Sequence, residues 1–253
     1  AALREAKRLG AKILSIVNVV GSSIARESDE TLYTWAGPEI AVATTKAYTT
    51  QLAVLDLLGL YLSKTLGSLD EAERRRILDE MLLLPEKLER VLAGKEDIQY
   101  FASRYFNLNS VFFIGRNIDY ALGLEGSLKL KEISYIHSEA YASGELKHGT
   151  ISLIEDGTLV VALGTYGKLF EKAMSNILEV KTRGGDVLAL TAESRRAEMS
   201  RTANGVISIP DAHPMLMPLL GVAPLQLFAY YVALMRGCDI DKPRNLAKSV
   251  TVE

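Results

Sequence analysis

Side chains able to move protons lie within a single stretch of this chain, from Lys129 to His148. The segment reads KLKEISYIHSEAYASGELKH, and it predicts a helix on which Lys129 and Glu132, three residues apart, share one face. A polar loop containing Ser138 and Gly144 is expected to follow and to end at His148. A carboxylate and an imidazole are the side chains that general acid–base catalysis on a small molecule requires.

A second basic site lies in the C-terminal tail, DKPRNLAKSVTVE. Arg244 and Lys248 are four residues apart, so in a helical turn they would share a face. The guanidinium would then favour the neutral amine of the lysine, which is the form that makes a Schiff base with a carbonyl. The competing interpretation is a solvated tail lysine without chemistry.

The residues of the central segment also have structural interpretations. Lys129 and Glu132 could form only an i,i+3 ion pair, worth about 0.2 to 0.5 kcal/mol. However, apolar neighbours such as Leu130 and Ile133 predict a mostly buried helix, in which a carboxylate needs a partner or a function. His148 could be a loop histidine bonded to the backbone, but its place in a polar loop favours a functional role.

Two further segments carry weaker signals. Thr44, Thr45 and Lys46 would begin a helix and could offer hydroxyls and N–H groups to a ligand, but N-capping is an equally good interpretation. Residues 115–117, Gly-Arg-Asn, lie between a predicted strand and a predicted helix, where an anion could bind. For them a tight turn is the better interpretation.

Composition excludes several classes of protein. The chain has 253 residues and a formal net charge of −2, so it has no basic field for nucleic acid. Its one cysteine, Cys238, allows neither an internal disulfide nor a cysteine-based zinc site, and it favours a reducing cytoplasm. The most apolar stretch, residues 219–235, contains Pro224 and is shorter than a bilayer span of about 20 residues, so it predicts a buried helix. Because the chain starts at Ala1 in a helical pattern without Met, we expect a fragment.

The order of elements predicts an α/β fold. In the first half, residues 11–20 and 32–37 predict strands of a parallel sheet, and residues 39–62 predict a helix. Residues 63–99 are charge-dense with periodic leucines, so they predict a helical connector that Pro85 divides. The SLDE sequence at residues 68–71 predicts a capping box.

A second α/β pattern follows the connector. The predicted strands are residues 110–115, 158–164, 186–191 and 206–210, and the predicted helices are residues 119–134, 168–183 and 217–236. Strands that alternate with helices imply right-handed βαβ units and a parallel sheet. Ligands of such sheets bind beyond the carboxyl ends of the strands.

Four segments resemble the isomerase half of the glutamine–fructose-6-phosphate aminotransferase family, namely GPEIAVATTKAYTTQL, LEGSLKLKEISYIHSEAYASGELKHG, RGGDVLALTA and PRNLAKSVTVE. The resemblance covers essentially the whole chain. It implies two SIS (sugar isomerase) domains, each a parallel sheet flanked by helices, the first one truncated at its N-terminus. The implied division is residues 1–66 for the end of the first SIS domain, 67–101 for a helical connector, 102–240 for the second SIS domain and 241–253 for a catalytic tail.

The resemblance also implies a reaction. Fructose 6-phosphate would form a Schiff base at C2 with Lys248, ammonia would replace the lysine, and Glu132 would move a proton between C1 and C2 to give glucosamine 6-phosphate. His148 would assist ring opening from the neighbouring subunit of a homodimer, while Lys129 would support the glutamate. The positions implied for sugar binding are Val42, Thr44, Arg244 and Ala247.

Parts of the family pattern are missing from this sequence. The glutaminase domain, which would supply ammonia from glutamine, is absent, and a phosphate-binding loop is expected just upstream of Ala1. The resemblance implies no cofactor, metal, nucleic acid or membrane partner. The alternatives are an SIS regulator that binds sugar phosphates and a related deglycase or sugar-phosphate isomerase. The joint presence of Glu132, His148 and Lys248 favours an enzyme over the regulator, and the tail PRNLAKSVTVE favours the synthase over the deglycase and the isomerase.

Overall fold

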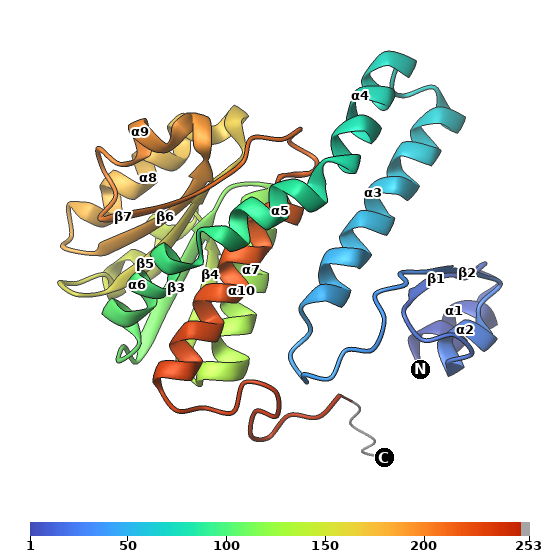
Figure 1. Cartoon of the computed structure of the whole chain (residues 1–253), viewed down its shortest axis with the longest axis horizontal. Helices are drawn as coiled ribbons and strands as arrows, with labels where there is room; N and C mark the ends of the chain where they lie inside the picture. Colours follow the sequence, from blue (N-terminus) through green and yellow to red (C-terminus); the bar gives the residue numbers. More distant parts are fainter. Residues whose placement is uncertain (249–253) are drawn as a thin grey trace. The chain divides into compact units, whose positions relative to one another are not determined.

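The computed structural model describes residues 1–248 and divides into two compact units, Ala1–Arg74 and Arg75–Glu253 (Figure 1). The last five residues of the predicted tail, 249–253, lie outside the described part. The first unit contains α1 (Ala2–Arg8), β1 (Leu14–Val17), α2 (Ser23–Glu27), β2 (Glu30–Tyr33) and α3 (Lys46–Leu66), and α4 (Glu71–Leu82) crosses the boundary.

The first unit has the parallel pairing that the sequence predicts, but its strands are shorter. β1 and β2 pair in parallel over four residues each. β2 ends at Tyr33 rather than at Gly37, because Trp35 and Gly37 have φ angles of 53° and 69° and leave the extended region. The short helix α2, which the sequence analysis missed, begins where Ser22 Oγ accepts the N–H of Ala25.

Two predicted helix starts in this region are wrong. α3 begins at Lys46 instead of residue 39, because the carboxylate of Glu39 accepts the N–H groups of Thr45 and Ala47 at 2.9 and 3.3 Å and so caps the helix. α4 is capped by Asp70, whose Oδ1 accepts the N–H of Glu73 at 2.7 Å, and not by a capping box at 68–71.

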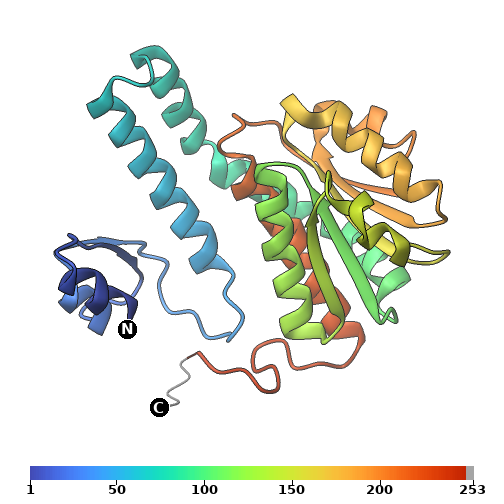
Figure 2. The same cartoon turned by 180° about the vertical axis from the view of Figure 1, so that it is seen from behind.

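The second unit is an α/β sandwich around a five-stranded parallel sheet with strand order β4-β3-β5-β6-β7 (Figures 1 and 2). Its strands are β3 (Ser110–Gly115), β4 (His137–Ala142), β5 (Leu159–Gly164), β6 (Asp186–Ala192) and β7 (Gly205–Ile209). Its α-helices are α5 (Leu84–Ala93), α6 (Lys95–Tyr105), α7 (Ile118–Ser134), α8 (Phe170–Lys181), α9 (Arg196–Met199) and α10 (Met217–Met235). Short 3₁₀ helices are η1 (Leu146–His148), η2 (Thr150–Leu153), η3 (Gly167–Leu169) and η4 (Glu193–Arg195).

Most of the predicted elements of this unit are confirmed, including the division at Pro85, which lies in the first turn of α5. β4 is the exception, since the sequence analysis expected a polar loop there. Within residues 1–248 the strand pairs only with β3, and its buried Ser138 is satisfied by hydrogen bonds with the carbonyl and hydroxyl of Ser127 at 2.7 and 3.0 Å. A polar residue can therefore occupy a buried strand position, which hides the strand from hydropathy.

Helices cover both faces of the sheet, which explains its apolar central strands. α7 and α10 pack together on one side, and α8 packs on β5 and β6 on the other (Figures 1 and 2). α10 is the one helix of the described residues that is long and apolar enough to cross a membrane, but 72% of its apolar window is buried inside the protein. The predicted buried helix is thus confirmed as a core element.

Asp119 joins the start of α7 to the end of β5. Its carboxylate is buried and accepts hydrogen bonds from the backbone N–H groups of Thr165 and Tyr166, both at 3.0 Å, and from the hydroxyl of Thr165. Burial raises the pKa of Asp119, and these hydrogen bonds oppose the rise. An internal carboxylate therefore occupies the donors of the turn after β5.

We expect Asp119→Ala to lower the free energy of unfolding by about 3 kcal/mol, because it leaves buried donors without an acceptor. Urea denaturation followed by circular dichroism measures the change. Asp79→Ala is the matched control, since Asp79 belongs to an exposed ion pair with Arg75 at 3.9 Å. Equal stability of the two variants would contradict this role for Asp119.

Candidate active site

A cluster of three charged side chains lies on one face of α7. Nζ of Lys129 is 2.5 Å from Oε2 of Glu132 and 3.6 Å from Oε1 of Glu125. The side chains of Lys129 and Glu125 are 5% and 10% exposed, whereas that of Glu132 is 22% exposed. The pairing of Lys129 with Glu132 is thus a largely buried contact rather than a surface ion pair, as the apolar neighbours predicted.

Glu132 keeps the capacity to accept a proton. Its Oε2 is buried and has no hydrogen bond of normal geometry within the described residues, although the ammonium of Lys129 is close. A carboxylate held by a neighbouring charge, with lone pairs left over, is suited to act as a general base. Burial raises the pKa of Glu125, which attraction to Lys129 opposes and the charge of Glu132 increases further.

Close packing fixes the position of α7. A Cβ atom at Gly126 would lie 2.8 Å from Cδ1 of Leu225 on α10 and 3.0 Å from Cε1 of Phe113 on β3, so only glycine allows this approach. One residue later, Ser127 bonds with Ser138 of β4. The helix that carries the charged cluster is therefore held against both neighbours.

Glu132 and His148 lie at opposite ends of the parallel strands, Glu132 near their amino ends and His148 beyond their carboxyl ends. α7 joins two parallel strands, so it runs back from the carboxyl end of β3 to the amino end of β4, and Glu132 is near its last turn. His148 lies in η1, beyond the carboxyl end of β4, and its side of the sheet is fixed by the hydrogen bond from the N–H of Ser143 to the carbonyl of Gly115. The two ends of the strands are separated by the length of β4, which is about 20 Å for six residues.

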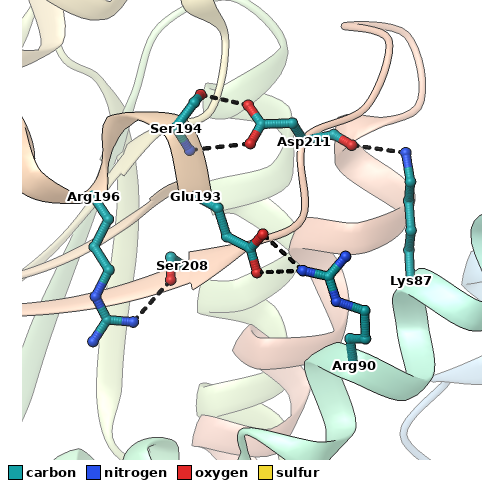
Figure 3. A network of polar contacts seen from close by, with 7 residues as sticks. All are labelled: Lys87, Arg90, Glu193, Ser194, Arg196, Ser208 and Asp211. Atoms are coloured by element: carbon teal, nitrogen blue, oxygen red, sulfur yellow. Dashed lines mark hydrogen bonds and ion pairs between the residues drawn. The ribbon is translucent and has the colours of Figure 1, made fainter.

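Side chains beyond the carboxyl ends of the strands largely make structural contacts. Figure 3 shows Asp211 accepting two hydrogen bonds from Ser194, while Lys87 of α5 donates to the carbonyl of Asp211 at 2.7 Å. Arg90, also on α5, pairs with Glu193 at 2.8 Å. The connector thus covers the ends of β6 and β7, and Asp119 fills the turn after β5. In this unit Glu132 lies near the amino ends of the strands, because α7 carries it away from the carboxyl ends, where ligands of parallel sheets bind.

The C-terminal tail starts near the end of α7, where Glu132 also lies. The guanidinium carbon of Arg244 lies 4.1 Å from the ring centroid of Tyr135, the residue that ends α7. Arg244 is thus stacked on an aromatic ring, and Ala247 and Lys248 follow it as exposed residues. A cavity of about 740 Å³ opens beside this contact. Its lining consists of Phe106, Asn107, Tyr135, Met235, Arg236, Gly237, Cys238, Asp239 and Arg244.

Val42 and Thr44 lie in the first unit, on the loop that joins the carboxyl end of β2 to α3. Asn18 shapes this loop, since its Nδ2 donates to the carbonyl of Gly37 at 2.7 Å and its Oδ1 accepts from the N–H of Ala36 at 2.9 Å. Both residues therefore lie beyond the carboxyl end of a strand, where ligands of parallel sheets bind. The cap on α3 comes from Glu39 rather than from a threonine hydroxyl.

Sequence reasoning missed Glu125 and Tyr135. Glu125 could have been found, because its spacing of four residues from Lys129 is the same kind of signal that identified Glu132. Tyr135 has no such signal, since its contact with Arg244 joins residues that are 109 positions apart.

A parallel sheet covered on both faces by helices defines an α/β domain. The chain belongs to the SIS domain family, whose model matches residues 1–61 and 105–236. It is 58% identical over all 253 residues to the glutamine–fructose-6-phosphate aminotransferase (isomerizing) of Clostridium acetobutylicum, and 50% identical over 253 residues to that of Thermococcus kodakarensis. It spans 41% and 42% of the lengths of these relatives.

Solved structures agree with this assignment. The C-terminal domain of glucosamine-fructose-6-phosphate aminotransferase from Francisella tularensis superposes with a TM-score of 0.92 at 35% identity, covering 96% of this chain and 69% of that chain. A glucosamine-6-phosphate deaminase from Thermotoga maritima has a TM-score of 0.67 at 24% identity, covering 94% of this chain and 66% of that chain, and shows the fold alone.

Proposed function

We propose that this chain is the isomerase half of a glucosamine-6-phosphate synthase, which converts fructose 6-phosphate and ammonia to glucosamine 6-phosphate. The observation that carries the proposal is the buried Glu125–Lys129–Glu132 cluster beside the origin of a tail that bears Lys248. The relatives named above, which match the whole chain, support the same reaction.

The chemistry divides between the amine and the carboxylate. The neutral amine of Lys248 adds to C2 of the open-chain ketose, and water leaves as the Schiff base forms. Ammonia then displaces the lysine, Glu132 removes a proton from C1, and the same carboxyl returns it to C2, which leaves an aldehyde at C1 and an amine at C2. Lys129 holds the carboxylate of Glu132 in place through its contact at 2.5 Å, while Val42, Thr44, Arg244 and Ala247 are assigned to binding of the sugar.

We also propose that the active unit is a homodimer in which His148 serves the neighbouring copy. Support comes from the separation of His148 and Glu132 by the length of β4, which is too long for both to reach one sugar in one copy. An imidazole is suited to protonate and deprotonate the ring oxygen and hydroxyl during ring opening.

The same proposal gives the setting of the chain. A glutaminase domain supplies the ammonia in the longer protein, and the enzyme works in the cytoplasm in amino-sugar synthesis. The proposed division of the chain is 1–66, 67–101, 102–240 and 241–253, with the last segment as the catalytic tail.

Borohydride trapping tests the Schiff base. Incubating the intact protein with fructose 6-phosphate and sodium borohydride should attach the reduced sugar to Lys248, as peptide mass spectrometry would detect. Lys248→Arg keeps the charge but should give no adduct, whereas Lys242→Arg, a change of another lysine in the same tail, should leave trapping intact. An unmodified Lys248 in the wild-type protein would exclude the proposed covalent step.

A further inference from the structure

The tail is attached to the end of α7 by two contacts that both use Tyr135. The phenol oxygen of Tyr135 accepts the backbone N–H of Arg244 at 2.8 Å, and the guanidinium of the same arginine stacks on the ring at 4.1 Å. Tyr135 itself is fixed, because it ends α7 with a φ of 62° and its N–H bonds to the carbonyl of Lys131 at 3.2 Å. One side chain therefore holds both the backbone and the side chain of Arg244.

The segment that leads to Arg244 is itself ordered by local bonds. The N–H of Cys238 donates to the carbonyl of Ala233 at 3.0 Å, which turns the chain at the end of α10. Oδ1 of Asp239 accepts the N–H groups of Asp241 and Lys242 at 3.0 and 2.9 Å. These bonds bring the chain toward α7, so the contact with Tyr135 is the last anchor described before Lys248.

The contact of Tyr135 with Arg244 lies close in sequence to both proposed catalytic groups. These groups are the carboxylate of Glu132, which acts at C1, and the amine of Lys248, which acts at C2. Tyr135 is three residues after Glu132, and Arg244 is four residues before Lys248. Four residues of extended chain span at most about 14 Å, so a fixed Arg244 confines Lys248 to the end of α7 where Glu132 lies. The anchor limits the positions that the tail can sample, which makes it more frequent that the amine meets a bound ketose.

We propose that Tyr135 is a positioning residue that sets the tail lysine in register with Glu132 for the Schiff-base step. This inference rests on the proposed function, since it gives Lys248 the role of the amine. Tyr135 does not touch the sugar and acts through Arg244. Its loss should therefore slow the formation of the Schiff base by a larger factor than it weakens the binding of fructose 6-phosphate, to which Arg244 also contributes.

Two variants of the intact protein test this role. Tyr135→Phe keeps the ring and loses the acceptor, so trapping of fructose 6-phosphate on Lys248 should slow about fivefold, the effect of one hydrogen bond. Tyr135→Leu also removes the cation–π contact, so trapping should slow about 20-fold. In both variants kcat should fall with the trapping rate, and by a larger factor than KM for fructose 6-phosphate rises. Tyr100→Phe, at a tyrosine that is 58% exposed, is the control and should trap normally.

Hydrogen exchange provides a readout that does not depend on turnover. The amide of Arg244 should be protected in the wild-type protein and should exchange faster in Tyr135→Phe, while amides in β5 stay protected if the fold is intact. If the wild-type protein traps the sugar and Tyr135→Phe traps it equally fast, Tyr135 is not a positioning residue. If the wild-type protein forms no adduct, the proposed covalent function fails instead.

Discussion

Replacing Glu132 with glutamine should abolish exchange of the C1 hydrogen of fructose 6-phosphate with solvent while the sugar still binds. Glutamine has nearly the shape of glutamate but cannot accept the proton. Loss of a positioned general base slows proton transfer by about 10² to 10⁴-fold. Exchange in deuterated water that contains an ammonium salt, followed by nuclear magnetic resonance of the sugar, measures this step without glutamine.

Two further variants distinguish the role of Glu132 as the base from the role of the side chains that hold it in place. Glu125→Gln should reduce exchange by only about tenfold, because Glu125 acts through Lys129 and does not touch the reacting atoms. Glu171→Gln changes an exposed carboxyl of α8 and should leave exchange unchanged. Borohydride trapping on Lys248 should persist in Glu132→Gln, since the Schiff base forms before the proton moves. Undiminished exchange in Glu132→Gln would remove the glutamate from the mechanism.

Local signals were the part of the site that the sequence predicted. Lys129 and Glu132 are three residues apart on a helix whose apolar neighbours are buried, and both the ion pair and its burial follow from that spacing. The strands of the second unit were predicted for a similar reason, because strands covered on both faces are continuous apolar runs, as in residues 159–164.

The features that were missed depend on side chains outside the helix or strand concerned. β4 looks like a loop because Ser138 is polar, and only its bond with Ser127 makes that residue compatible with a buried strand. The start of α3 depends on Glu39, a residue of the preceding loop whose carboxylate accepts N–H groups of the first turn. The contact of Tyr135 with Arg244 closes a separation of 109 residues, and no pattern within either segment predicts it.

Mixing two inactive variants, Glu132→Gln and His148→Ala, should restore activity. In a dimer that contains one copy of each, one site combines the intact Glu132 of the second copy with the intact His148 of the first. The other site carries both changes. Random exchange of subunits places one active site in half of the dimers, so activity should return to about one quarter of the wild-type value.

The activity of the mixed variants distinguishes an active site shared between two subunits from an active site formed by one subunit. If His148 acted on the sugar beside Glu132 of its own copy, every site in the mixture would contain one defect and activity would stay at the level of the single variants. The subunits must exchange for the test to be valid, which co-expression with two different affinity tags ensures. The control is a mixture of Glu132→Gln with Glu132→Ala, which should stay inactive because no site then holds the base. About 20 Å of strand separates the edges that carry Glu132 and His148, so restoration is the outcome that this fold favours.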